Sequence, residues 1–146
     1  MANGRGGLAM DAEGLAAFMA REFPQVAGDF AIERLAPREI DVRLKVDDRH
    51  LRPGGTVSGP SMFALADVSV YLAVLAMIGP QALAVTTGCS MDFMRKPAAA
   101  TDMIARCRLL KLGRALAVGD VLLYSDGAEE PVARATMTYS IPPARG

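Results

Sequence analysis

The sequence predicts an α+β fold in which an antiparallel sheet curls around one long apolar helix. Residues 60–78 (PSMFALADVSVYLAVLAMI) are apolar on nearly every side, which is typical of a helix buried in a core. Residues 40–47 alternate apolar and charged side chains, and residues 82–141 contain four further strand-like segments. A flat sheet would leave one flank of such a helix exposed to water. We therefore expect five or six strands curled around it, in a single domain of 146 residues.

The N-terminal part is expected to contain a short helix. Residues 1–10 are Gly-rich and are expected to be flexible. Residues 11–23 place apolar side chains on one helical face, with Asp11 as the N-cap, and Pro24 ends the helix.

Turn residues mark the other boundaries. The segment 48–57 contains charges, a Pro and a Gly pair, so we expect a loop there. The long helix is expected to begin at Gly59 and Pro60 and to end before Gly79 and Pro80. The four later strands are expected at residues 82–94, 101–112, 115–125 and 131–141.

Charge and cysteine spacing argue against several classes of function. The 16 Lys and Arg residues balance the 16 Asp and Glu residues, and no basic run appears, so no nucleic-acid or membrane partner is expected. Cys89 and Cys107 lie far from each other and from the one histidine, which excludes the usual zinc spacings, and no metal is expected.

The first residues lack the apolar run of a secretory signal, so a cytoplasmic location is expected. The long helix approaches the length of a membrane span, but it contains Asp67, which favours a buried core helix.

Asp67 is the one charged residue between Arg52 and Asp92. A carboxylate in apolar surroundings is kept either hydrogen-bonded for structure or poised for proton transfer. Gly59 lies eight residues earlier, at the helix N-terminus, where free N–H groups polarise a carbonyl oxygen; the alternative is a merely flexible helix start. A hydrogen-bond donor and a carboxylate form the minimum set for hydrolysing a thioester.

The segment from His50 to Asp67 resembles the PaaI-like thioesterases of the phenylacetate pathway, a family with the hot-dog fold. The run HLRPGGTVSGP (50–60), followed by ALAD (64–67), is similar to that family's pattern H-x-N-P-x-G-T-V-H-G-G with L-A-D/E on the central helix. The resemblance covers residues 40–140 and implies hydrolysis of an acyl-CoA thioester. Later matching segments are VTT (85–87), FMRKP (93–97), KLGR (111–114) and VARAT (132–136).

The resemblance implies roles for three residues in catalysis. Asp67 falls at the position of the general base or nucleophile, and Gly59 at that of the backbone N–H that polarises the thioester carbonyl. Thr86 falls at or beside a hydroxyl that helps to hold the attacking water. No cofactor is expected, since CoA is part of the substrate.

The resemblance also implies contacts with substrate and with a second copy of the chain. Basic residues at the positions of Arg95, Lys96 and Arg114 meet the phosphates or ribose of CoA in similar proteins. The site is expected to straddle the interface of a homodimer or a dimer of dimers. A pocket lined by Met62 and Phe63 is expected to accept apolar acyl chains. Further candidates for substrate contact are His50, Arg52, Pro60 and Phe63.

Two positions depart from the family pattern: Ser58 replaces a His, and Arg52 replaces an Asn. Ser58, a candidate for the catalytic site, is expected first to cap the long helix. The two changes leave open a non-catalytic acyl-CoA-binding or sensing protein, although a binding site has no evident need for Asp67. A hydratase or dehydratase would pair a His with an acidic residue, but His50, the only histidine, is expected to support its loop.

Overall fold

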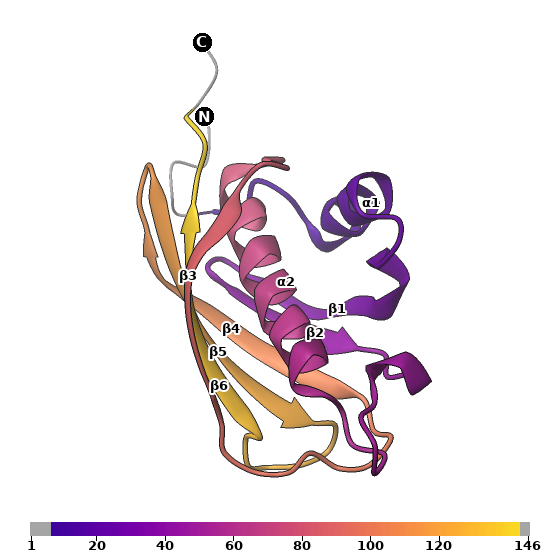
Figure 1. The fold of residues 1–146 in the computed structure, drawn as a ribbon. Helices are drawn as coiled ribbons and strands as arrows, with labels where there is room; N and C mark the ends of the chain where they lie inside the picture. Colours follow the sequence, from indigo (N-terminus) through magenta and orange to yellow (C-terminus); the bar gives the residue numbers. More distant parts are fainter. Residues whose placement is uncertain (1–6, 144–146) are drawn as a thin grey trace.

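The computed structural model describes residues 7–143, and these form two α-helices, two short 3₁₀ helices and six strands (Figure 1). Their bounds are α1 Ala12–Glu22, η1 Ala27–Asp29, β1 Phe30–Ala36, β2 Glu39–Leu44, η2 Asp48–His50, α2 Gly59–Ile78, β3 Val85–Phe93, β4 Met103–Leu112, β5 Leu116–Ser125 and β6 Ala133–Ser140.

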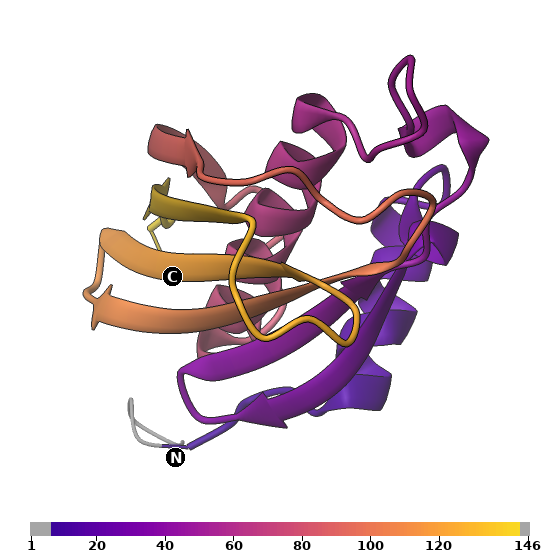
Figure 2. The same cartoon turned by 90° about the horizontal axis from the view of Figure 1, so that it is seen from below.

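The six strands form one antiparallel sheet in the order β1-β2-β4-β5-β6-β3. The sheet curls around α2, as the two views in Figures 1 and 2 show. This confirms the expected α+β class and hot-dog fold, and the sheet has six of the expected five or six strands. Strands β1 and β3 form the two edges of the sheet, so β3 pairs within the chain along one side only.

Helix α2 forms the centre of the core. The helix is long and apolar enough to cross a membrane, and 67% of its most apolar stretch is buried inside the protein. Buried and more exposed side chains alternate along β5 and along β4 up to Leu109, where the register shifts, and the buried set gives α2 an apolar wall. Gly119 on β5 permits the closest approach, because a Cβ there would lie 2.9 Å from both Val70 methyl carbons.

Helix α1 packs beside the C-terminal half of α2. Its N-cap is Asp11, as expected, with the carboxylate accepting a hydrogen bond from the Gly14 N–H at 2.8 Å. Before α1, the N–H groups of Ala9 and Met10 both donate to the Ala76 carbonyl. Residues 9 and 10 are thus hydrogen-bonded to α2, whereas residues 1–6 of the segment expected to be flexible lie outside the described range.

The alternating strand is shorter than expected. It was predicted to reach residue 47, but β2 ends at Leu44. The next two N–H groups leave the sheet: Lys45 donates to the Asp29 carbonyl and Val46 to the Asp102 carboxylate. Alternation alone could not reveal this change of hydrogen-bond partners.

Candidate functional site

The N-terminus of α2 is capped by Ser58, as the sequence predicted. The Ser58 hydroxyl oxygen accepts from the Ser61 N–H at 3.2 Å and lies 2.9 Å from the Ser61 hydroxyl. Among the described residues, no acceptor bonds to the Gly59 N–H, so this donor is free to meet a ligand.

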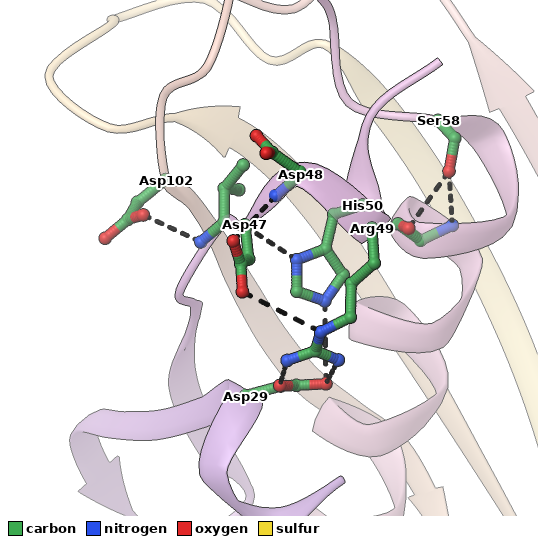
Figure 3. Close-up of polar contacts among 9 residues, drawn as sticks. Asp29, Asp47, Asp48, Arg49, His50, Ser58 and Asp102 are labelled. Atoms are coloured by element: carbon green, nitrogen blue, oxygen red, sulfur yellow. Dashed lines mark hydrogen bonds and ion pairs between the residues drawn. The ribbon is translucent and has the colours of Figure 1, made fainter.

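A polar cluster in the preceding loop fixes the position of this helix start (Figure 3). The His50 Nδ1 atom accepts from the Asp47 N–H at 2.9 Å, and its Nε2 atom lies 3.5 Å from an Asp29 carboxylate oxygen. Both oxygens of Asp29 also accept from the Arg49 guanidinium, which holds the pKa of that carboxyl below its usual range against the effect of burial. Because the His50 carbonyl accepts from the Ser58 N–H at 2.8 Å, the cluster connects directly to the cap of α2.

His50 therefore has Nδ1 bonded within its own loop and Nε2 facing Asp29 of η1, and it lines neither of the two cavities described below. This geometry agrees with the loop-supporting role inferred from the sequence. The structure pairs His50 with the acid Asp29, but this pair lines neither cavity and does not include Asp67, so it does not form the site that a hydratase would require.

Asp67 accepts two hydrogen bonds on one carboxylate oxygen. Thr86 on β3 and Tyr139 on β6 form a cross-strand pair, so both hydroxyls lie on the sheet face that meets α2. The Thr86 hydroxyl donates to Asp67 Oδ1 at 2.5 Å, and the Tyr139 hydroxyl donates to the same oxygen at 2.7 Å. Among the described residues, no donor reaches Oδ2, which leaves that oxygen available to a water molecule.

Tyr139 is the residue of this group that sequence reasoning missed. The side chain is buried, and its hydroxyl also lies 3.1 Å from the Asp67 carbonyl oxygen. Burial, and then the charge of Asp67, raises the pKa of Tyr139, so the phenol stays protonated and acts as a donor. A usable signal was the apolar alternation of the last strand, which places position 139 on the buried face, although it does not reveal the partner.

The predicted residues divide between two cavities. The larger, of about 610 Å³, is lined by the Gly59 region of α2 and by Phe93 at the end of β3. The smaller, of about 180 Å³, is lined by Asp67, Thr86, Tyr139 and a set of apolar side chains. The basic residues that line the larger cavity are Arg52, Arg95 and Lys96.

Gly59 and Asp67 do not meet within one chain. Eight residues of α-helix separate their Cα atoms by about 12 Å along the axis. In addition, N–H groups of an α-helix point toward its N-terminus, so an oxygen bound to the Gly59 N–H lies beyond the helix end, farther still from Asp67. A single copy of the chain therefore does not bring these two predicted residues together, and the expectation that the site straddles a dimer interface stays a prediction.

Strand β3 links the two cavities because it runs antiparallel to α2. At its beginning Thr86 contacts Asp67, and at its end the Phe93 ring lies 3.5 Å from where a Gly59 Cβ would be. The side chains of Val85 and Phe93 are 56% and 54% exposed, although both are large and apolar. The unpaired edge of β3 thus exposes apolar side chains next to each cavity.

The remaining predicted residues lie elsewhere. Arg114 is in the turn between β4 and β5, next to the end of β6 that pairs with the start of β3, so it is at the opposite end of the sheet from Arg95 and Lys96. Arg95 donates to the Pro131 carbonyl. Pro60 and Phe63 line neither cavity, and Phe63 is 39% exposed.

The two residues predicted to line an acyl pocket lie apart from Asp67. Met62 lines the cavity beside Gly59, whereas the apolar cavity beside Asp67 has neither Met62 nor Phe63 in its walls. Helical geometry accounts for this position, because residues 62 and 63 lie within the first five residues of α2, close to Gly59.

Comparison with known proteins gives a consistent set of relatives. A family model described as the thioesterase superfamily matches residues 54–132. A "putative esterase" of Pseudomonas aeruginosa is 30% identical over 115 residues, covering 79% of this chain and 84% of the relative. A solved "putative thioesterase" from Silicibacter sp. TM1040 is 63% identical with a TM-score of 0.89, covering 97% of each chain. A mutant of the phenylacetic acid degradation protein PaaI from Thermus thermophilus is 32% identical with a TM-score of 0.70, covering 82% of this chain and 99% of that one.

Proposed function

Since this chain belongs to the thioesterase superfamily and is PaaI-like, we propose that it hydrolyses an acyl-CoA thioester with Asp67 as the general base. One observation carries the catalytic assignment. Asp67 lines a cavity and has one oxygen held by the Thr86 and Tyr139 hydroxyls, while no donor in residues 7–143 reaches its other oxygen. A purely structural carboxylate would have no need of a free oxygen beside an apolar cavity.

In the proposed reaction, Asp67 Oδ2 takes a proton from water as the water oxygen bonds to the thioester carbonyl carbon. The carbonyl oxygen gains negative charge, which a backbone N–H stabilises at a helix N-terminus. The C–S bond then breaks, and the proton passes from Asp67 to the departing CoA sulfur. The carboxylate is thereby regenerated without a cofactor.

The Gly59 N–H that stabilises this charge comes, in our proposal, from a second copy of the chain. Two β3 strands paired antiparallel about Cys89 and Ser90 would place Thr86 of one copy opposite Phe93 of the other. The cavity beside Asp67 would then join the partner's cavity beside Gly59. The basic residues Arg52, Arg95 and Lys96 of that second cavity are suited to the CoA phosphates.

Mixing two inactive variants tests both the chemistry and the shared site. Asp67→Asn removes the base, and Gly59→Pro removes the N–H while suiting the first turn of a helix. A mixed dimer regains one complete site, so random pairing of equal amounts should restore about one quarter of wild-type activity. No recovery from a confirmed mixed dimer would refute the shared site, and a stable, active monomer in light scattering would refute dimerisation.

A further inference from the structure

We infer that the cavity beside Asp67 is the acyl pocket and that Phe23, the C-cap residue of α1, limits it to acyl groups of about six carbon atoms. This inference rests on the proposed hydrolysis, and it adds the class of acyl group. Besides the Asp67 carboxylate and the Thr86 and Tyr139 hydroxyls, the walls of the cavity are apolar or aromatic. They are Met19, Phe23, Val26, Val68, Tyr71, Ala84 and Val85.

The chemistry of the two cavities assigns the two halves of the substrate. In the cavity beside Asp67 the only charged residue is the anionic Asp67, so this space repels the phosphates of CoA. The cavity beside Gly59 instead has three basic residues in its walls. When the thioester carbon lies next to Asp67, its acyl group therefore points into the apolar cavity. Its sulfur, which carries CoA, points away from that cavity.

The volume of the cavity sets the size of the group. At about 180 Å³ it is close to the engineered apolar cavity of about 150 Å³ that binds benzene in another protein. A chain of about six carbon atoms, or a ring of that size, would fill such a space. Longer chains must displace the wall or extend outside it.

Three aromatic side chains form a continuous part of the wall, and the most exposed of them is Phe23, the C-cap residue of α1. The Phe23 ring packs edge-on against Tyr71, with centroids 5.7 Å apart and planes at 87°, and Tyr71 lies 6.0 Å from the Tyr139 ring. Tyr71 is itself held in place, because its hydroxyl donates to the Ala82 carbonyl at 3.2 Å. Phe23 and Val26 are 36% and 38% exposed, so they form the outer wall, where substitution changes the cavity without entering the core.

The experiment measures kcat/KM for acetyl-, butyryl-, hexanoyl-, octanoyl- and dodecanoyl-CoA by release of the CoA thiol. For the wild type, kcat/KM should rise about fourfold per added methylene up to hexanoyl-CoA and then fall. Phe23→Ala should move the maximum to octanoyl- or dodecanoyl-CoA. Val26→Phe should move it to butyryl-CoA, and Leu110→Ala, an exposed residue on β4, should leave the profile unchanged.

A wild-type maximum at dodecanoyl-CoA, or a maximum unmoved in both wall variants, would overturn the inference. If the wild type hydrolyses none of the five substrates, the proposed function fails, and calorimetric binding then tests the pocket separately. Hexanoyl-CoA should bind at least about tenfold more tightly than CoA alone, and Val26→Phe should abolish that difference. Equal affinity of the wild type for CoA and hexanoyl-CoA would refute the pocket.

Discussion

Replacing Tyr139 with Phe removes a hydroxyl that lies 2.7 Å from Asp67 Oδ1 and 3.1 Å from the Asp67 carbonyl oxygen. A hydrogen bond to a charged group contributes about 1.5–3 kcal/mol. If that contribution holds the carboxylate in its productive orientation, its loss should lower kcat by about 10- to 100-fold. KM should change little, because the phenol acts on Asp67 rather than on the leaving group.

The assay follows CoA release at saturating substrate, together with thermal unfolding of each variant. Tyr124→Phe is a matched control, since it also removes one phenol hydroxyl from a strand but lines neither cavity. Thr86→Val removes the other donor to Oδ1. Because both donors act on one oxygen, the activation free energy should rise less in the double variant than the sum of the two single effects. A Tyr139→Phe enzyme with unchanged kcat but a lower melting temperature would refute the positioning role.

Three further perturbations test the surrounding structure. Ser58→Ala removes the N-cap of α2, so it should lower the free energy of unfolding by about 0.5–2 kcal/mol while turnover changes modestly; a large fall in turnover at constant stability would contradict the capping role. Gly119→Ala places a Cβ 2.9 Å from the Val70 methyl carbons, so it should lower the free energy of unfolding, measured in urea, by about 1–3 kcal/mol. An unchanged free energy of unfolding would contradict this and would mean that α2 moves away from the sheet easily. Burial raises the pKa of the Cys107 thiol to about 12, so the stability that this group contributes is present below its unfolded value near 9.0 and is lost as the pH rises toward 12. Between pH 8 and pH 10.5 the free energy of unfolding of the wild type should fall by about 2 kcal/mol because of this thiol. The Cys107→Val variant should not show this part of the fall. An equal fall in both proteins would exclude the thiol as the cause.

Much of the fold could be predicted from the sequence because its patterns are local. An apolar run that ends at Gly79 and four strand-like segments were sufficient to define α2 and its sheet. Strand β1 was not separately located, since its side chains do not alternate between buried and exposed at the edge of the sheet.

The candidate site was predicted only in part because its geometry depends on pairing across the chain. The match to the family pattern indicated Asp67 and Thr86, and the structure brings these two together. Tyr139 required the register of β3 against β6, which no local pattern specifies. The walls that α1 adds to the cavity beside Asp67 required the docking of Phe23 against Tyr71, which is a tertiary contact.

The proposed catalytic role of Asp67 is tested most directly by the turnover of Asp67→Asn on the best acyl-CoA substrate. An Asn side chain has the same shape and retains an oxygen that accepts from Thr86 and Tyr139, but it is not a base. We expect kcat to fall by about a hundredfold or more while the melting temperature and the oligomeric state remain those of the wild type. Wild-type turnover in a correctly folded Asp67→Asn protein would contradict the assignment of Asp67 as the general base.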